Sequence, residues 1–119
     1  MAVPILKQGP YLIATVQAAM TDSEAIGLRD DLMHKIGAYR SRGVIVDVTA
    51  LDVMDSFAAR SLRSIAQMTL LRGADTVVVG MQPEVAFTMV QLGLGFEDVH
   101  TALDLEEGLE FLDLRTGTG

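Results

Sequence analysis

The chain has 119 residues, half of them hydrophobic, with no cysteine and a formal net charge of −7 at pH 7. This length suits one globular domain that buries its own core. The acidic balance argues against binding to nucleic acid or anionic membranes, and the lack of cysteine excludes disulfides and thiolate metal sites. No apolar run approaches a membrane span and no secretory signal opens the chain, so we expect a cytoplasmic protein.

The first third of the chain predicts two strands and a helix. Residues 3–17 contain two short apolar stretches around the turn signal Gln8-Gly9-Pro10, which is typical of a hairpin. Thr21 and Glu24 fit a capping box at the start of a helix that Gly43 would end. Apolar residues then recur at helical spacing and predict its inward stripe, which consists of Ala25, Leu28, Leu32, Ile36 and Tyr39.

The remaining chain alternates apolar strands with helices. The predicted elements are a strand at 44–48, a helix at 56–71, a strand at 76–80, a helix at 84–92 preceded by Pro83, a strand at 98–103, and a helix at 104–114 before a frayed tail. Strands as apolar as 44–48 and 76–80 are typical of central positions buried on both faces. The helical period predicts that the helix at 56–71, which Gly73 would end, places Arg60 outward and has an inward stripe of Ala58, Leu62, Ile65, Ala66 and Thr69. The order β-β-α-β-α-β-α-β-α predicts an α/β fold with a mixed, mostly parallel sheet covered by helices, and residues 1–119 form a single domain.

Residue spacing disfavours several kinds of catalytic or ligand site. The two histidines, His34 and His100, lie in different predicted elements, and neither has a partner at metal-ligand spacing. The chain contains no phosphate-binding loop of the G-x-x-x-x-G-K type. Ser56 is not in a nucleophile elbow, because Met54 and Ala58 occupy the glycine positions. We therefore expect no metal, no cofactor and no enzymatic activity.

An aspartate that accepts a phosphoryl group is a more specific alternative to these sites. Asp47 lies in a predicted central strand, and Asp52 and Asp55 follow in the next loop. Receiver domains phosphorylate such an aspartate with Mg²⁺, but they need an acidic pair after the first strand and a lysine near the last one. Here no acidic pair ends the first strands and no lysine follows Lys35, so that metal cage cannot be built.

Ser56 has two interpretations. Asp55 and Ser56 are both preferred helix caps, and periodicity alone favours a cap. Because Asp55 is a competent cap, Ser56 is free to take the first helical position with its hydroxyl outward. A phosphate there would meet the positive end of the helix and would pair with Arg60 one turn on. About −2 of charge arriving beside Asp52 and Asp55 would repel a docked partner without unfolding the helix.

The stretch "VIVDVTALDVMDSFAARSL" resembles the core of the STAS domain family. In that family an apolar strand leads to an Asp-Ser or Asp-Thr pair at a helix start, and a partner kinase phosphorylates the hydroxyl. The resemblance covers essentially the whole chain as a single STAS domain. The stretches "GMQPEVAFTMVQLGL" and "TALDLEEGLEFL" resemble the scaffold group of the bacterial stressosome, the RsbS type.

The resemblance implies a non-catalytic scaffold that controls the bacterial general stress response. It would assemble with RsbR-type STAS co-antagonists, in homo- and hetero-oligomers, and sequester an RsbT-type serine/threonine-protein kinase. That kinase would phosphorylate Ser56, and an RsbX-type phosphatase would reset the site. Thr88 is a second candidate phosphosite by analogy, although a helix-face residue bonded to its own backbone is the favoured interpretation. The alternative function is a simple anti-sigma factor antagonist that binds an anti-sigma kinase without a large assembly.

Phe57 departs from the simpler members of the family, which often carry Ser-Ser-Gly after the aspartate. A bulky ring beside the phosphosite predicts either core packing or an exposed contact with a partner, and both interpretations stay open. The residues expected to contact a partner near Ser56 are Asp52, Asp55, Phe57 and Arg60.

Overall fold

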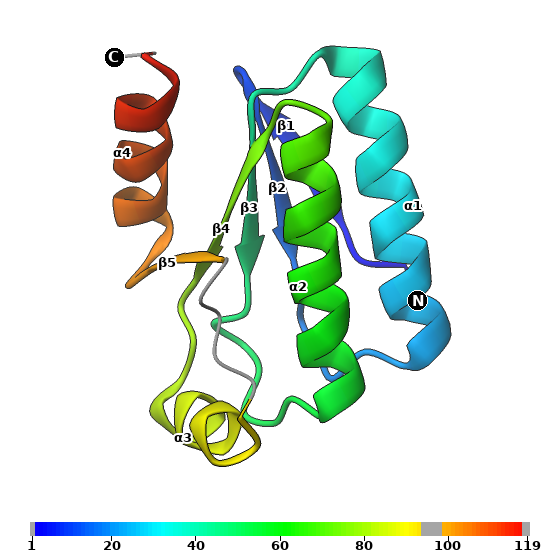
Figure 1. The fold of residues 1–119 in the computed structure, drawn as a ribbon, viewed down its shortest axis with the longest axis vertical. Coiled ribbons are helices and arrows are strands. Elements are labelled where there is room, and N and C mark those ends of the chain that lie inside the picture. The colour runs from blue at the N-terminus through cyan, green and yellow to red at the C-terminus, as the bar shows by residue number, and fades with distance from the viewer. Residues whose placement is uncertain (1, 94–98, 118–119) are drawn as a thin grey trace.

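A five-stranded sheet with helices on both faces forms the computed structural model, which describes residues 2–93 and 99–117 (Figure 1). The order of the elements is the predicted one. They are β1 (Ile5–Gln8), β2 (Tyr11–Thr15), α1 (Asp22–Tyr39), β3 (Gly43–Asp47), α2 (Ser56–Leu71), β4 (Asp75–Val79), α3 (Pro83–Gln91), β5 (His100–Ala102) and α4 (Leu105–Thr116). The strands lie side by side in chain order; β1 is antiparallel to β2, and all other neighbours are parallel. The predicted mixed, mostly parallel sheet is therefore confirmed.

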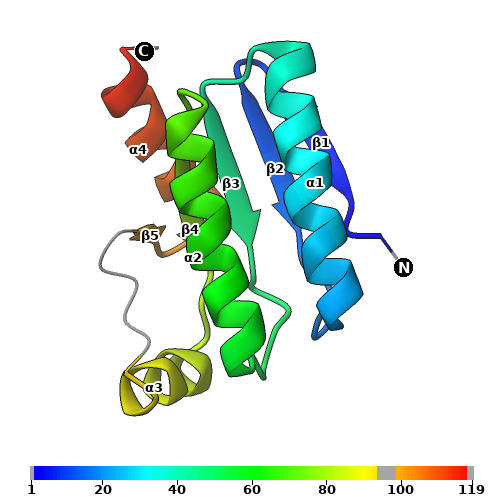
Figure 2. The same cartoon turned by 45° about the vertical axis from the view of Figure 1, so that its right-hand side comes forward.

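The sheet separates two hydrophobic cores. Successive residues of a strand point to opposite faces, so Val44 and Val46 of β3 join the core beneath α1 and α2, and Ile45 joins the core beneath α4. Figure 2 shows α1 and α2 side by side on one face and α4 on the other. The helix α3 lies beyond the ends of the strands, and its inner residues Val85 and Met89 are buried in the first core.

The start of α1 matches its prediction. The Thr21 hydroxyl accepts from the Glu24 N–H at 3.2 Å, and the Thr21 N–H donates to the Glu24 carboxylate at 3.0 Å. The backbone hydrogen bond from Thr21 lowers the pKa of Glu24, because it favours the ionised carboxylate. The capping box therefore fixes where the helix begins.

The end of α1 differs from its prediction. The helix ends at Tyr39, and the next residue, Arg40, adopts a left-handed backbone conformation with φ of 51°. Gly43 instead begins β3, where an added Cβ would lie 2.9 Å from side-chain atoms of Tyr11 and Leu112. Tyr39 does not extend the buried stripe, since it is 49% exposed. Close packing against the sheet, and not helix termination, accounts for the glycine at position 43.

The closing helix also runs further than predicted. It extends to Thr116 and so includes Arg115 and Thr116, for which the sequence predicts a frayed tail. Arg115 explains part of this extension, because its guanidinium lies 3.4 Å from the carboxylate of Asp75 on β4. The sequence also predicts that Gly93 ends the helix before it and that Leu94 packs back on that helix, but residue 94 lies outside the described residues. Within the described residues, no helix combines the length and hydrophobicity that crossing a membrane requires.

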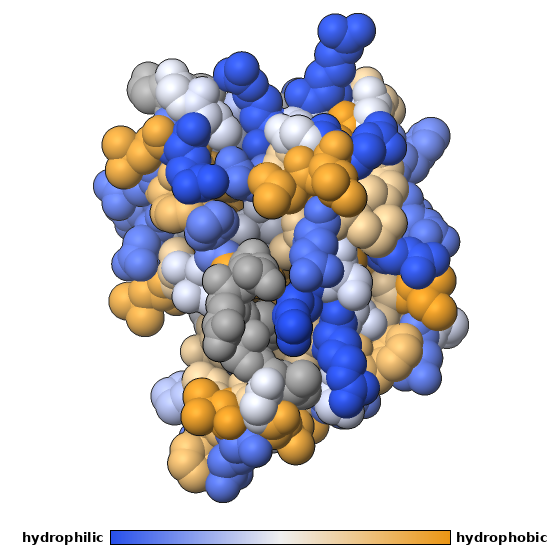
Figure 3. All heavy atoms as spheres, viewed as in Figure 1, coloured by the Kyte–Doolittle hydropathy of each residue, from blue (hydrophilic) through white to orange (hydrophobic). Residues whose placement is uncertain are grey.

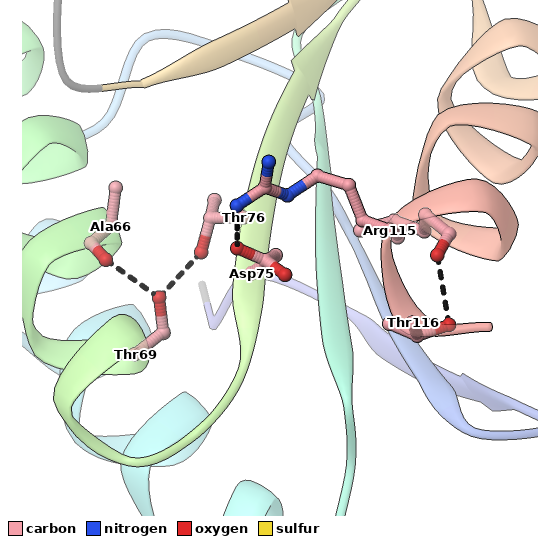
Figure 4. A network of polar contacts seen from close by, with 7 residues as sticks. Ala66, Thr69, Asp75, Thr76, Arg115 and Thr116 are labelled. Carbon is pink, nitrogen blue, oxygen red and sulfur yellow. Dashed lines mark hydrogen bonds and ion pairs between the residues drawn. The ribbon is translucent and has the colours of Figure 1, made fainter.

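Polar contacts join β4 to both helical layers (Figure 4). Asp75 faces Arg115 of α4, whereas its neighbour Thr76 points the other way, and its hydroxyl lies 2.6 Å from that of Thr69 on α2. The Thr69 hydroxyl donates to the Ala66 carbonyl at 2.9 Å. The Thr76 hydroxyl must then donate to Thr69, and both groups are buried.

We expect Thr69→Val to destabilise the fold more than Thr76→Val does. The first substitution leaves the buried Thr76 hydroxyl without an acceptor and should lower the free energy of unfolding by about 1–3 kcal/mol. The second leaves Thr69 bonded to the Ala66 carbonyl and should cost about 1 kcal/mol. Urea unfolding of the two single variants and the double variant measures both effects. If the losses of the two single variants simply add in the double variant, the two hydroxyls do not interact.

Candidate functional site

The segment between β3 and α2, residues 48–55, holds several of the predicted site residues. The Leu51 N–H donates to the Val48 carbonyl at 2.9 Å and closes a turn. Leu51 and Met54 are buried and anchor the segment to the core, while Asp52 is exposed. Two apolar side chains thus hold a loop whose acidic group faces solvent.

Asp55 is the N-cap of α2. Its carboxylate accepts from the Ala58 N–H at 2.8 Å, and its backbone is extended, as a capping residue requires. Ser56 is therefore the first residue of the helix. The Ser56 side chain is half-buried, and its hydroxyl makes no hydrogen bond to the described part of the chain. The cap is occupied by Asp55, which leaves the serine hydroxyl at the positive end of the helix dipole.

Phe57 and Arg60 line a groove that runs between α1 and α2. The groove has a volume of 480 Å³, and Ile26 and Arg29 of α1 form part of its other wall. Phe57 is 38% exposed, so its ring is neither buried in the core nor fully in solvent. Arg60 points outward as predicted and makes no ion pair with any residue that the structure describes.

A hydrogen-bonded network connects the end of β3 to the loop after β4. One carboxylate oxygen of Asp47 accepts from both the N–H and the hydroxyl of Thr49, at 2.9 and 2.6 Å. The Thr49 carbonyl accepts from the Gln82 side-chain amide at 2.8 Å. Gly80 lies beside them with φ of +77°, and an added Cβ there would overlap the Thr49 hydroxyl. The sequence interpretation missed Thr49 and Gln82, and the Asp-x-Thr spacing after a buried strand is the one local signal for the first of them.

The other predicted candidates lie elsewhere. Thr88 is exposed on α3, and its hydroxyl donates to the Glu84 carbonyl at 3.0 Å, which is the backbone-bonded arrangement favoured for it. His34 is exposed on α1, whereas the ring of His100 on β5 lies 4.7 Å from that of Phe111. Over residues 2–93 and 99–117, no three His, Cys, Asp or Glu side chains are placed to hold a metal ion.

Comparison with known proteins identifies a matching family and similar solved structures. The model of the STAS domain matches residues 2–108. A serine-to-glutamate variant of RsbS from Moorella thermoacetica is 33% identical, with 98% of each chain covered and a TM-score of 0.83. A chain of a structure that describes the molecular architecture of the stressosome is 32% identical, with 95% of this chain and 98% of that one covered and a TM-score of 0.76.

One relative is much longer than this chain. The RsbT co-antagonist protein RsbRA of Bacillus subtilis (strain 168) is 29% identical over 83 residues, which are 70% of this chain and 30% of that protein. The chain therefore spans less than a third of this co-antagonist, whereas it covers 98% of the solved RsbS variant.

Proposed function

Since the chain belongs to the STAS domain family and is related to RsbS and other stressosome components, we propose that it is a non-catalytic stressosome scaffold. In this function it sequesters an RsbT-type serine/threonine-protein kinase in the cytoplasm and is regulated by phosphorylation at Ser56. The observation that carries the proposal is the occupied cap: the Asp55 carboxylate accepts from the Ala58 N–H, and the Ser56 hydroxyl is left for a partner. The likeness to RsbS over the full chain supports the scaffold.

Phosphorylation would act through charge at the start of α2. The kinase transfers the γ-phosphoryl group of ATP to the Ser56 oxygen, a kinase base takes the hydroxyl proton, and ADP leaves. The dianionic product is stabilised by the N–H groups of the first turn, and Arg60 lies four residues on, at the spacing of neighbours on a helix. The same charge stands beside Asp52 and Asp55 and repels the acidic or apolar surface of a docked partner. Release of the kinase, with α2 intact, is the expected result.

The proposed assembly includes further partners. RsbR-type co-antagonists would supply neighbouring STAS domains, and an RsbX-type phosphatase would hydrolyse the phosphoserine to restore the hydroxyl. The exposed Asp52 and Arg60 side chains and the half-exposed Phe57 side chain are the contacts near the phosphosite that we assign to partner proteins.

We expect Ser56→Asp to keep the fold and to weaken capture of the kinase by about tenfold or more, because it places a carboxylate among the acidic side chains of the interface. Surface-immobilised kinase measures the affinity, and far-UV circular dichroism measures the helix content. Thr88→Asp, which adds the same charge on α3, is the matched control and should bind as the wild type does. Full capture by Ser56→Asp, or a melted spectrum, would contradict the proposed switch.

A further inference from the structure

The groove between α1 and α2 carries positive charge on a strongly acidic chain. Arg29 and Arg60 line it, and a smaller hollow that shares Arg60 adds Arg63. Among the described residues, no aspartate or glutamate lines either hollow. Arg29 is paired with Asp30 at 3.0 Å, but Arg60 and Arg63 form no ion pair within the described chain. Two guanidinium charges on α2 thus remain without a counter-charge.

Each wall of this groove also presents an apolar side chain. Ile26 of α1 is 43% exposed and Phe57 of α2 is 38% exposed. Both line the same hollow as Arg29 and Arg60. The groove therefore suits an occupant that combines bulky apolar side chains with carboxylates.

The outer side of α4 has this combination. Glu107, Glu110 and Leu114 follow one another at steps of three and four residues, which places them along one side of the helix. Leu103 lies just before the helix, where its N–H donates to the Glu107 carboxylate at 3.3 Å. Leu103 and Leu114 are 76% and 87% exposed, and both glutamates are exposed. Along the α4 edge of the molecule, hydrophobic side chains lie at two heights with hydrophilic ones between them (Figure 3).

We propose that the α1–α2 groove binds the outer side of α4 from a second copy of this chain. The α4 carboxylates would meet Arg60 and Arg63, and the two exposed leucines would cover Ile26 and Phe57. The proposal rests on the proposed scaffold function and deepens it, because it assigns a surface to self-assembly. The helices α1 and α2, which line the groove, lie on the opposite face of the sheet from α4 (Figure 2), so one copy offers both surfaces at once. Such a contact is head-to-tail and extends beyond two copies.

Charge reversal on either side tests the contact. Sedimentation velocity over a dilution series at low salt should show the wild-type mass rising with concentration, and added salt should oppose this. Arg60→Glu and Glu110→Arg should each weaken self-association by about tenfold or more. Arg42→Glu and Asp31→Arg make the same charge changes at exposed positions outside both surfaces, and they should associate as the wild type does.

Mixing the two reversed variants gives the sharper result. An equimolar mixture of Arg60→Glu and Glu110→Arg contains one unaltered groove and one unaltered α4, so it should form a complex that neither variant forms alone. Failure of the mixture to associate would overturn the proposal, as would a wild-type chain that stays monomeric throughout the series, or control variants that weaken as much as the test variants.

The kinase assay separates this inference from the function on which it rests. Ser56 lies at the start of α2, and α4 packs on the other face of the sheet, so Glu110→Arg should still accept phosphate from the kinase. Phosphorylation of a wild-type chain that does not self-associate would overturn the contact alone. Self-association of a wild-type chain that the kinase does not phosphorylate would support the contact and overturn the proposed function.

Discussion

Ser56→Ala should abolish the phosphate that an RsbT-type kinase transfers from ATP to the wild-type chain. The substitution removes the hydroxyl at the start of α2, and the second candidate phosphosite, Thr88, has its hydroxyl bonded to the Glu84 carbonyl at 3.0 Å. Labelling should fall to the level seen without kinase. Mass spectrometry of the wild-type chain should place the phosphate on Ser56.

Two further variants make that loss interpretable. Ser56→Thr keeps a hydroxyl at the same position and should still be labelled, and Thr88→Ala should be labelled as the wild type is. Ser56→Ala should also leave stability nearly unchanged, since the cap belongs to its neighbour. Asp55→Ala, by contrast, removes the 2.8 Å bond to the Ala58 N–H and should cost about 1 kcal/mol. Undiminished labelling of Ser56→Ala would show that the site is assigned wrongly.

The helix that carries Ser56 could be predicted closely from the sequence. Its predicted range of 56–71 is the observed one, and its predicted inward stripe is buried. That stripe consists of Ala58, Leu62, Ile65, Ala66 and Thr69. The prediction succeeds because a capping aspartate, a 3.6-residue apolar period and Gly73 after the last turn all agree.

The end of α1 could not be predicted in the same way. Arg40 terminates the helix in a left-handed conformation that side chains other than glycine rarely adopt, so no local signal marks it. The sequence indicates Gly43 as the terminator instead. That position requires glycine because a Cβ would collide with Tyr11 and Leu112, which are distant in sequence. A glycine that tertiary packing requires cannot be distinguished, from the sequence alone, from a glycine that terminates a helix.

The surroundings of Ser56 were predictable only in part. The exposure of Arg60 follows from helical periodicity, but the half-exposed state of Phe57 depends on how closely α1 approaches α2. The contact between Thr49 and Gln82 spans 33 residues and exists because β3 and β4 are parallel neighbours whose ends meet at one edge of the sheet. Periodicity carries information about burial within one element, and it carries none about which loops meet.

Among substitutions that add a single methyl group near the site, Gly80→Ala should lower the free energy of unfolding most. Gly80 has φ of +77°, which costs an L-residue about 1–2 kcal/mol, and the new Cβ would overlap the Thr49 hydroxyl. Thr49 would have to move, and its movement would break the bonds to Asp47 and Gln82. We expect the free energy of unfolding to fall by about 2–4 kcal/mol, as measured by urea denaturation.

Gly73→Ala separates backbone strain from this steric overlap. Gly73 has φ of +86°, yet no heavy atom lies within 4 Å of an added Cβ, so its substitution carries the conformational cost alone. The excess loss in Gly80→Ala then reports the contact with Thr49, and Thr49→Ala in that background should recover part of it. Equal losses at the two glycines would mean that Thr49 is not held against Gly80. Because the loop that Thr49 anchors leads directly to Asp55 and Ser56, Gly80→Ala should also slow phosphorylation by the kinase, whereas Gly73→Ala should not.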